Sequence, residues 1–237
     1  MQINPETGAV VLVNKPISWT CFDVVNKMRY AVIKNLHKYH IDVPAGKRKI
    51  KVGHAGTLDP LATGLLIICI GKETKNIETY MADEKEYTGI ITLGASTSSY
   101  DLETPFDQQF ETSHIFEEMI YQTAHNFIGV QQQFPPVFSA IKQDGKRLYE
   151  SARLGEEIEI KPREIEVKSF EISRIEMPHV HFKIVCSKGT YIRSIAHDFG
   201  KKIGSGSHLS QLCRTRSGKY MLSDAYELDA LIQEINS

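Results

Sequence analysis

A run of six apolar residues, from Leu65 to Ile70, is the feature that most constrains how this chain can fold. The run is short, contains three β-branched isoleucines and ends at Gly71, so it predicts a buried strand. The preceding stretch, Gly53 to Gly64, contains three glycines and one carboxylate, Asp59, which Pro60 follows. A carboxylate on a glycine-rich loop beside a core strand is held rigidly, as a catalytic group must be. The alternative is an ordinary turn, because Asp-Pro pairs commonly form turns.

The composition is that of a soluble globular protein, with 41% hydrophobic and 24% charged residues. The 237 residues suffice for one large domain or two small ones. No apolar run approaches the roughly 20 residues that span a bilayer, and the N-terminus lacks the pattern of a signal peptide. The four cysteines form no CxxC pair, which favours free thiols over disulfides or zinc ligands. A cytoplasmic protein without a membrane segment is expected.

Charge is distributed unevenly, although the net charge is only −1. The segment from Lys27 to Lys51 contains eight Lys or Arg and one acid, and the segment from Lys183 to Lys219 repeats those numbers. The segment from Asp101 to Glu118 contains six acids and no Lys or Arg. Two basic segments suggest a positive face for a polyanion such as RNA. A solvated surface helix explains either segment alone equally well.

Apolar periodicity predicts further strands and helices along the chain. Strands are expected over residues 9–13, 85–94, 164–175 and 179–187. Helices are expected after a capping box at Thr20 and Asp23, over residues 115–128 and 146–154, and from about 192 to 203. The periodicity of the last helix puts Arg193 in its first turn and off its buried stripe.

Four strings of residues carry the strongest information about function. They are His54–Gly64 (HAGTLDPLATG), Gln133–Lys142 (QFPPVFSAIK), Cys186–Ile195 (CSKGTYIRSI) and Gly204–Arg214 (GSGSHLSQLCR). Together they resemble the motifs of the TruB family of tRNA pseudouridine synthases, and the resemblance covers residues from about 9 to 229. The resemblance implies an α+β pseudouridine synthase fold, with a mixed, mainly antiparallel sheet flanked by helices and a central catalytic cleft. It also implies a single catalytic domain over residues 1–237, which isomerises uridine to pseudouridine at position 55 in the T loop of tRNA.

The resemblance also assigns roles to individual residues. It makes Asp59 the essential catalytic residue, pairs Arg193 with it, and stacks Tyr87 on the target base. In the same way His54 takes the space left by the flipped nucleotide and Leu212 lines the pocket. For Lys15 two alternatives stay open: a place near the active site or on a phosphate, and an ordinary lysine at the end of a strand. The remaining residues assigned to substrate binding lie in the matching strings and are Gly56, Thr57 and Tyr191.

The chain departs from the family pattern in three places. Ile17 and Trp19 stand in the segment after Lys15-Pro16, where the family usually has a glycine and a Ser/Thr pair. A basic insertion covers residues of about 37–51, and the chain ends too early for the C-terminal RNA-binding PUA domain of many family members. The catalytic domain is therefore expected to supply the affinity for tRNA by itself.

No metal and no organic cofactor is expected, because no His/Cys cluster has ligand spacing and no Walker or dinucleotide glycine pattern appears. The expected partner is the T-stem loop of tRNA, with no membrane, no obligate protein partner and a monomeric enzyme. Two alternatives remain for the function: a pseudouridine synthase that acts on another RNA, and a tRNA-folding chaperone that binds without turnover.

Overall fold

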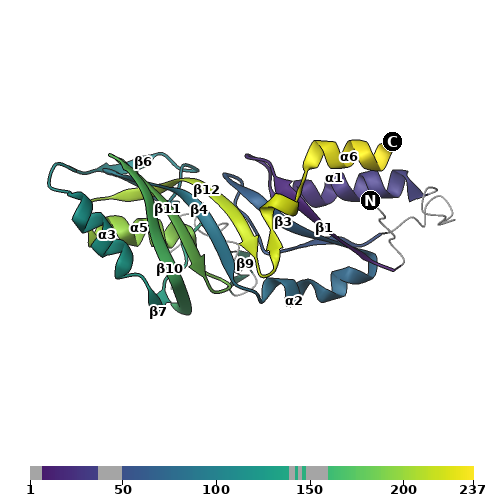
Figure 1. Cartoon of the computed structure of the whole chain (residues 1–237), viewed down its shortest axis with the longest axis horizontal. Coiled ribbons are helices and arrows are strands. Elements are labelled where there is room, and N and C mark those ends of the chain that lie inside the picture. The colour runs from purple at the N-terminus through teal and green to yellow at the C-terminus, as the bar shows by residue number, and fades with distance from the viewer. Residues whose placement is uncertain (1–6, 37–49, 139–141, 144–145, 148–159) are drawn as a thin grey trace. The chain divides into compact units, whose positions relative to one another are not determined.

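The computed structural model describes residues 7–36, 50–138, 142–143, 146–147 and 160–237. The chain divides into two compact units: the first comprises Met1–Lys85 and Cys213–Ser237, and the second comprises Glu86–Leu212 (Figure 1). In the sequence, the second unit lies between the two segments of the first. The single catalytic domain over residues 1–237 stays a prediction. The chain passes between the units at the start of strand β4 (Lys85–Leu93) and within strand β12 (Ser207–Ser217).

The first unit is built on a sheet with the strand order β14-β1-β3-β12, in which β2 also pairs with β3 and β13 with β12. Its central strand, β3, covers Ala62–Ile70 and contains the apolar run from Leu65 to Ile70, all of it without exposed surface. The predicted buried strand is therefore confirmed. The neighbouring strands are β1 (Ala9–Lys15), antiparallel to β3, and β2 (Val52–Ala55), β13 (Tyr220–Met221) and β14 (Tyr226–Glu227).

Helices complete the first unit. Helix α1 begins after Thr20, whose side chain and that of Asp23 form the predicted capping box. It buries a stripe that includes Val24, Val25 and Met28, and it contacts helix α6. The helices of this unit are α1 (Cys21–Lys34), η2 (Gly71–Asn76), α2 (Ile77–Met81), η3 (Leu222–Asp224) and α6 (Leu228–Asn236).

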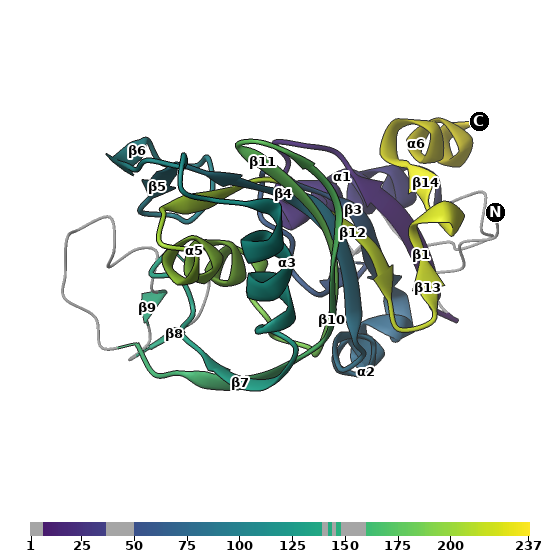
Figure 2. The same cartoon turned by 60° about the vertical axis from the view of Figure 1, so that its left-hand side comes forward.

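In the second unit the strand order is β12-β4-β11-β10-β7, where β7 covers Gly129–Gln133, β10 Arg163–Glu176 and β11 His179–Cys186. Helix α3 (Glu117–His125) contacts β10 and α5 (Ile192–Lys202), as Figure 2 shows. Four phenylalanine rings, Phe127, Phe170, Phe182 and Phe199, form its core, with neighbouring ring centroids 5.8–6.2 Å apart. The fold is α+β, as predicted.

Two short hairpins complete the second unit. They pair β5 (Ala95–Thr97) with β6 (Phe106–Gln109) and β8 (Lys142–Gln143) with β9 (Lys146–Arg147). The helix predicted over residues 146–154 is therefore wrong at its start, where hairpin pairing replaces it, and residues 148–154 lie outside the described ones. Within the described ranges, no helix has the length and apolar character needed to cross a membrane.

Candidate active site

Residues 56–61, which we call the Asp59 loop, connect β2 to β3 in the first unit. The loop starts at Gly56, whose φ of 86° lies in the left-handed region that glycine adopts at little cost. It ends in a turn in which the N–H of Ala62 donates to the carbonyl oxygen of Asp59 at 3.0 Å. Within the loop, Leu58 is buried, whereas Asp59 is half-buried. A fixed backbone thus carries a partly accessible carboxylate.

Lys15, at the end of β1, anchors the loop from one side. Its side chain has no exposed surface, and its ammonium donates to the carbonyl oxygens of Pro16, Trp19 and Pro60 at 2.9, 2.6 and 3.2 Å. Burial lowers the pKa of Lys15, and negative groups that include Asp59 oppose this shift. Lys15 lies beside the Asp59 loop, and main-chain carbonyls accept all three hydrogens of its ammonium. Its assignment to substrate binding stays a prediction.

Arg214, in β12, anchors the loop from the other side and was given no role by the sequence analysis. Its guanidinium is 1% exposed and donates through Nε to Leu65 at 2.8 Å, through Nη2 to Gly56 at 3.0 Å and through Nη1 to Thr57 at 3.5 Å. All three acceptors are main-chain carbonyl oxygens. A Cβ on Gly64 would lie 2.4 Å from the carbonyl oxygen of Arg214, so only glycine allows β3 and β12 to approach here.

Cys21 supplies a third anchor at the start of α1. Its Sγ accepts from the N–H of Leu58 at 3.1 Å and donates to the Leu58 carbonyl oxygen at 3.4 Å. Burial raises the pKa of Cys21, which keeps the thiol protonated and able to donate. The backbone next to Asp59 is therefore held by a thiol as well as by two buried cations.

Three predicted substrate-binding residues lie in or beside the Asp59 loop. Thr57 is exposed, Gly56 is half-buried above the Arg214 guanidinium, and His54 lies in β2. Burial, together with the charge of Arg214, lowers the pKa of His54 against the opposing effect of the Gly56 backbone. The ring is therefore neutral near pH 7. Its Nδ1 is buried and makes no hydrogen bond among the described residues.

Arg193 lies in the second unit, in the first turn of α5. The prediction that it lies off the buried stripe was wrong, because its side chain is only 3% exposed. Its Nη1 donates to the carbonyl oxygen of Ser99 and its Nη2 to that of Phe138, both at 3.0 Å. Asp101 lies within ion-pair distance, with 3.6 Å between Nε and Oδ2, and is also buried. These partners, distant in sequence, are what make burial of the guanidinium possible.

An aromatic stack lies beside the Arg193–Asp101 pair. The rings of Tyr100 and His197 stack with centroids 3.8 Å apart and planes 13° apart. Tyr100 has a φ of 65°, a left-handed backbone that is unusual for an aromatic residue. Because Tyr100 precedes Asp101 and His197 lies one helical turn after Arg193, the stack fastens the segment with the carboxylate to the helix with the guanidinium.

The remaining predicted residues lie in the second unit. Tyr191 is the N-cap of α5; its N–H donates to Oε1 of Gln133 at 2.8 Å, and its carbonyl oxygen accepts from Nε2 of Gln133 at 3.0 Å. Tyr87 lies in β4 with 8% exposure, and Leu212 in β12 is half-buried. The predicted pairing of Arg193 with Asp59 joins the two units and stays a prediction. Most of the basic insertion, residues 37–49, lies outside the described residues.

Comparison with known proteins identifies the class of enzyme. Residues 45–192 match the model of the TruB family pseudouridylate synthase N-terminal domain. A solved structure of a Cbf5–Nop10–Gar1 complex aligns with a TM-score of 0.70 and 26% identity, over 97% of this chain and 55% of that one. The class is therefore that of the pseudouridylate synthases.

Relatives place the chain more closely. It is 52% identical to tRNA pseudouridine synthase B of Flavobacterium johnsoniae, over 93% of each chain. It is 46% identical to tRNA pseudouridine synthase B of Phocaeicola vulgatus, over 96% of this chain and 93% of that protein. The chain belongs to the TruB family.

Proposed function

We propose that this protein is a tRNA pseudouridine synthase that converts uridine 55 in the T loop of tRNA to pseudouridine, with Asp59 as the residue that starts the reaction. The observation that carries this proposal is the anchoring of the Asp59 loop by Lys15, Cys21 and Arg214. A reaction that begins at one carboxylate needs that group held within a fraction of an ångström of its target. Relatives named tRNA pseudouridine synthase B, similar over nearly their whole length, support tRNA as the substrate.

The reaction is an isomerisation in which every atom of uridine is kept. The bond between N1 of the base and C1′ of the ribose breaks, and a bond between C5 and C1′ forms. C5 then loses its proton and N1 gains one, so no oxidant, reductant or co-reactant is consumed. Asp59 acts as a nucleophile, on the sugar or on the base, or as a base that removes a ribose proton. Each of these roles requires the ionised carboxylate.

The proposal also assigns roles to residues of the second unit. Arg193, whose guanidinium is fixed by Ser99, Phe138 and Asp101, is the partner assigned to Asp59. Tyr87 stacks on the flipped base and Leu212 packs against it, because chemistry on a base requires taking it out of the stack. His54 occupies the space that the base leaves. Tyr191, Gly56 and Thr57 contact the nucleotides around the target.

The enzyme acts as a monomer on the T-stem loop, without an obligate protein partner, in the cytoplasm. Because contacts with phosphates release counterions, affinity for tRNA depends steeply on salt.

Replacement of Asp59 by asparagine tests the proposal. Asp59→Asn keeps the size of the side chain and removes its charge, so tRNA binding should persist while tritium release from C5-labelled transcript becomes undetectable. The matched control is Asp224→Asn, at an exposed carboxylate of the same unit, which should keep the wild-type rate. A tenth of the wild-type rate in Asp59→Asn would be a cost of only about 1.4 kcal/mol and would contradict a central role. Product from a transcript with cytidine at position 55 would contradict the assigned position.

A further inference from the structure

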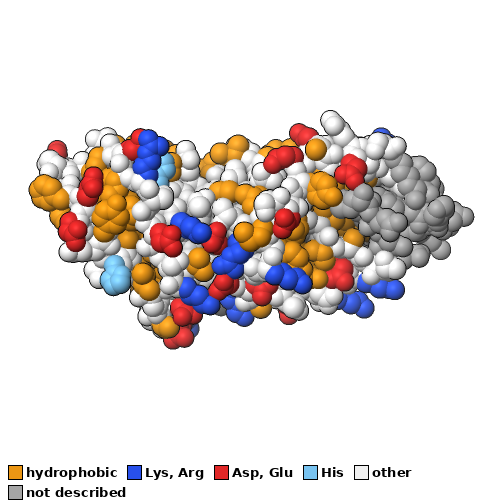
Figure 3. Space-filling model, viewed as in Figure 1, with side chains coloured by type: hydrophobic (Ala, Val, Ile, Leu, Met, Phe, Trp, Pro, Cys, Tyr) orange, Lys and Arg blue, Asp and Glu red, His pale blue; other side chains and the backbone are white. Residues whose placement is uncertain are grey.

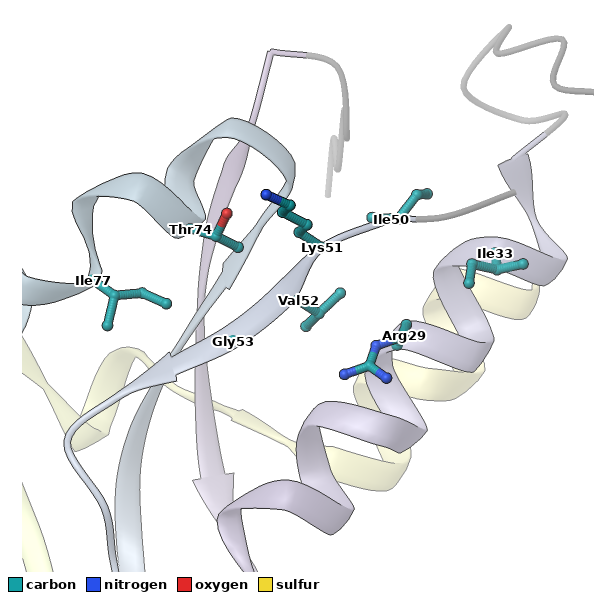
Figure 4. Close-up of a pocket in the computed structure, with 8 residues that line it drawn as sticks. All are labelled: Arg29, Ile33, Ile50, Lys51, Val52, Gly53, Thr74 and Ile77. Atoms are coloured by element: carbon teal, nitrogen blue, oxygen red, sulfur yellow. The ribbon is translucent and has the colours of Figure 1, made fainter. Parts of the chain in front are cut away.

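We infer that a pocket in the first unit, between α1, the start of β2 and η2, binds a backbone phosphate of the substrate RNA through Arg29 and Lys51. The inference rests on the proposed function, since it names a second contact with the same substrate. The pocket has a volume of about 640 Å³, which lies within the range of small-molecule sites. Figure 4 shows Arg29 reaching from α1 toward β2, and Lys51 beside Thr74.

Two cations from separate segments of the chain line this hollow. Among the described residues, neither the Arg29 guanidinium nor the Lys51 ammonium has an ion-pair or hydrogen-bond partner. Some other cations of the chain are paired, for example Lys27 with Asp229 at 2.6 Å and Arg216 with Glu84 at 2.8 Å. Two like charges that line one hollow without a counterion repel each other, and an anion bound there reduces that repulsion.

No carboxylate lines the pocket within the part of the chain that the structure describes. Glu73 precedes the lining residue Thr74, but its carboxylate accepts from Asn76 and Tyr80 at 3.0 and 2.8 Å. The Thr74 hydroxyl donates to the carbonyl oxygen of Gly71 at 2.7 Å, so it serves a ligand only as an acceptor. The donors available to a ligand are therefore the two cations, and the ligand class they select is an anion.

Aliphatic side chains form the rest of the wall and suit the sugar beside a phosphate. Val52 and Ile77 lie on either side of Gly53, where an added Cβ would lie 2.7 Å from Cδ1 of Ile77. The absence of a side chain at Gly53 thus lets Ile77 pack closely on β2. A charged rim over an aliphatic wall fits a sugar–phosphate unit better than a bare inorganic ion.

The place of the pocket in the fold favours RNA as the source of the phosphate. Arg29 lies eight residues along α1 from Cys21, which hydrogen-bonds the Asp59 loop, so the two points are about 12 Å apart along the helix. One RNA can therefore contact both. On the face shown in Figure 3, Lys and Arg lie among acidic residues, so that face offers no uniformly positive surface. A local pair of free cations then supplies the attraction for a polyanion.

Equilibrium binding of an unmodified tRNA transcript at several salt concentrations tests the inference. All proteins carry Asp59→Asn, so that no turnover occurs, and wild-type turnover is measured separately. The double variant Arg29→Met/Lys51→Met should weaken binding about tenfold at low salt. It should also lower the slope of log K against log salt by about 0.7–0.9, the value for one phosphate contact. The Tm of each variant is measured alongside, to exclude misfolding.

The matched control is Lys34→Met/Lys75→Met, which removes two exposed cations from the same helices without touching the pocket. This control should change the slope of log K against log salt by less than half of the change in Arg29→Met/Lys51→Met. Equal changes of slope in both double variants would overturn the inference. The Tm of each protein is also measured with uridine monophosphate or inorganic phosphate. A rise in Tm that only Arg29→Met/Lys51→Met loses, together with an unchanged salt slope for tRNA, would assign the pocket to free phosphates. That result would overturn RNA as the ligand. A wild-type protein that forms no pseudouridine in tRNA would instead contradict the proposed function.

Discussion

Among the residues that the structure describes, each unit buries one arginine, and the two arginines have different partners. Arg214 in the first unit directs its guanidinium at three main-chain carbonyl oxygens. Arg193 in the second unit meets two carbonyls and, in addition, the buried carboxylate of Asp101. Arg214 therefore fixes the course of the backbone around Asp59, whereas Arg193 forms part of a group of charges.

This difference indicates two separate roles for a buried arginine: one holds the backbone in place, and the other takes part in the electrostatics of the site. A buried cation loses its hydration, and neutral carbonyl acceptors restore little of it. A guanidinium that contacts only carbonyls therefore costs free energy, and we interpret Arg214 as a residue that fixes the position of the backbone. A guanidinium beside a carboxylate instead forms an ion pair that orients both groups. The following predictions separate the two uses, from the largest expected effect to the smallest.

Removal of the Arg214 guanidinium should have the largest effect on stability. In Arg214→Met three carbonyl oxygens lose a buried donor, and we expect the free energy of unfolding to fall by about 3–5 kcal/mol. Arg214→Lys should recover only part of this loss, because an ammonium cannot reach all three acceptors as a planar guanidinium does. Denaturation by urea, followed by circular dichroism, measures the difference.

The control for Arg214 is Lys219→Met, which removes an exposed cation of the same unit. Surface changes of this kind usually stay within about 0.5 kcal/mol. If Arg214→Met changes the free energy of unfolding by no more than about 0.5 kcal/mol, an anchoring role is contradicted.

Replacement of Arg193 by lysine should affect the rate more than the stability. Lysine keeps the charge but loses the planar geometry of the guanidinium, so the single-turnover rate should fall at least about a hundredfold, or about 2.7 kcal/mol. Arg193→Met should be slower still, and less stable, because it leaves Asp101 buried without its cation. Rates on an unmodified transcript, with Tm measured in parallel, separate the two effects.

Lys201→Met, at an exposed position near the end of the same helix, should keep its rate within twofold of wild type. If Arg193→Lys also stays within twofold, the proposed pairing with Asp59 is wrong.

Several features of the fold that depend on local sequence were predicted correctly. The apolar run of β3, the capping box of α1 and the start of α5 depend on neighbouring residues, and local patterns detect them. The sequence offers no signal for the two compact units, because the chain passes between them inside strands β4 and β12 rather than through a polar linker.

The supports of the candidate site depend on contacts that are distant in sequence. Arg193 is bonded to carbonyls of Ser99 and Phe138, 94 and 55 residues away, so its helical periodicity predicted the wrong exposure. The anchoring by Arg214 was missed because main-chain acceptors leave no side-chain motif. The sequence did contain one signal. Arg214 ends the motif Gly204–Arg214, and that motif contains no carboxylate with which an arginine could pair. The sequence places Asp101 in an acidic segment but does not indicate it as the partner of Arg193.

The smallest expected effect concerns His197, which stacks on Tyr100 beside the charged group of the second unit. Burial, with the nearby charge of Lys201, lowers the pKa of His197 to about 4. The unfolded chain has the ordinary value of about 6.5 and therefore binds a proton first, so this stabilisation is present above pH 6.5 and is lost as the pH falls toward 4. Between pH 7 and pH 5 the loss should be about 2 kcal/mol in the free energy of unfolding.

His197→Phe keeps a ring on Tyr100 but cannot titrate. Its loss of free energy of unfolding over this pH range should therefore be smaller by that amount. The control is His125→Phe, at an exposed ring, which should behave like wild type. Equal losses in wild type and His197→Phe would show that the stack contributes nothing to the pH dependence.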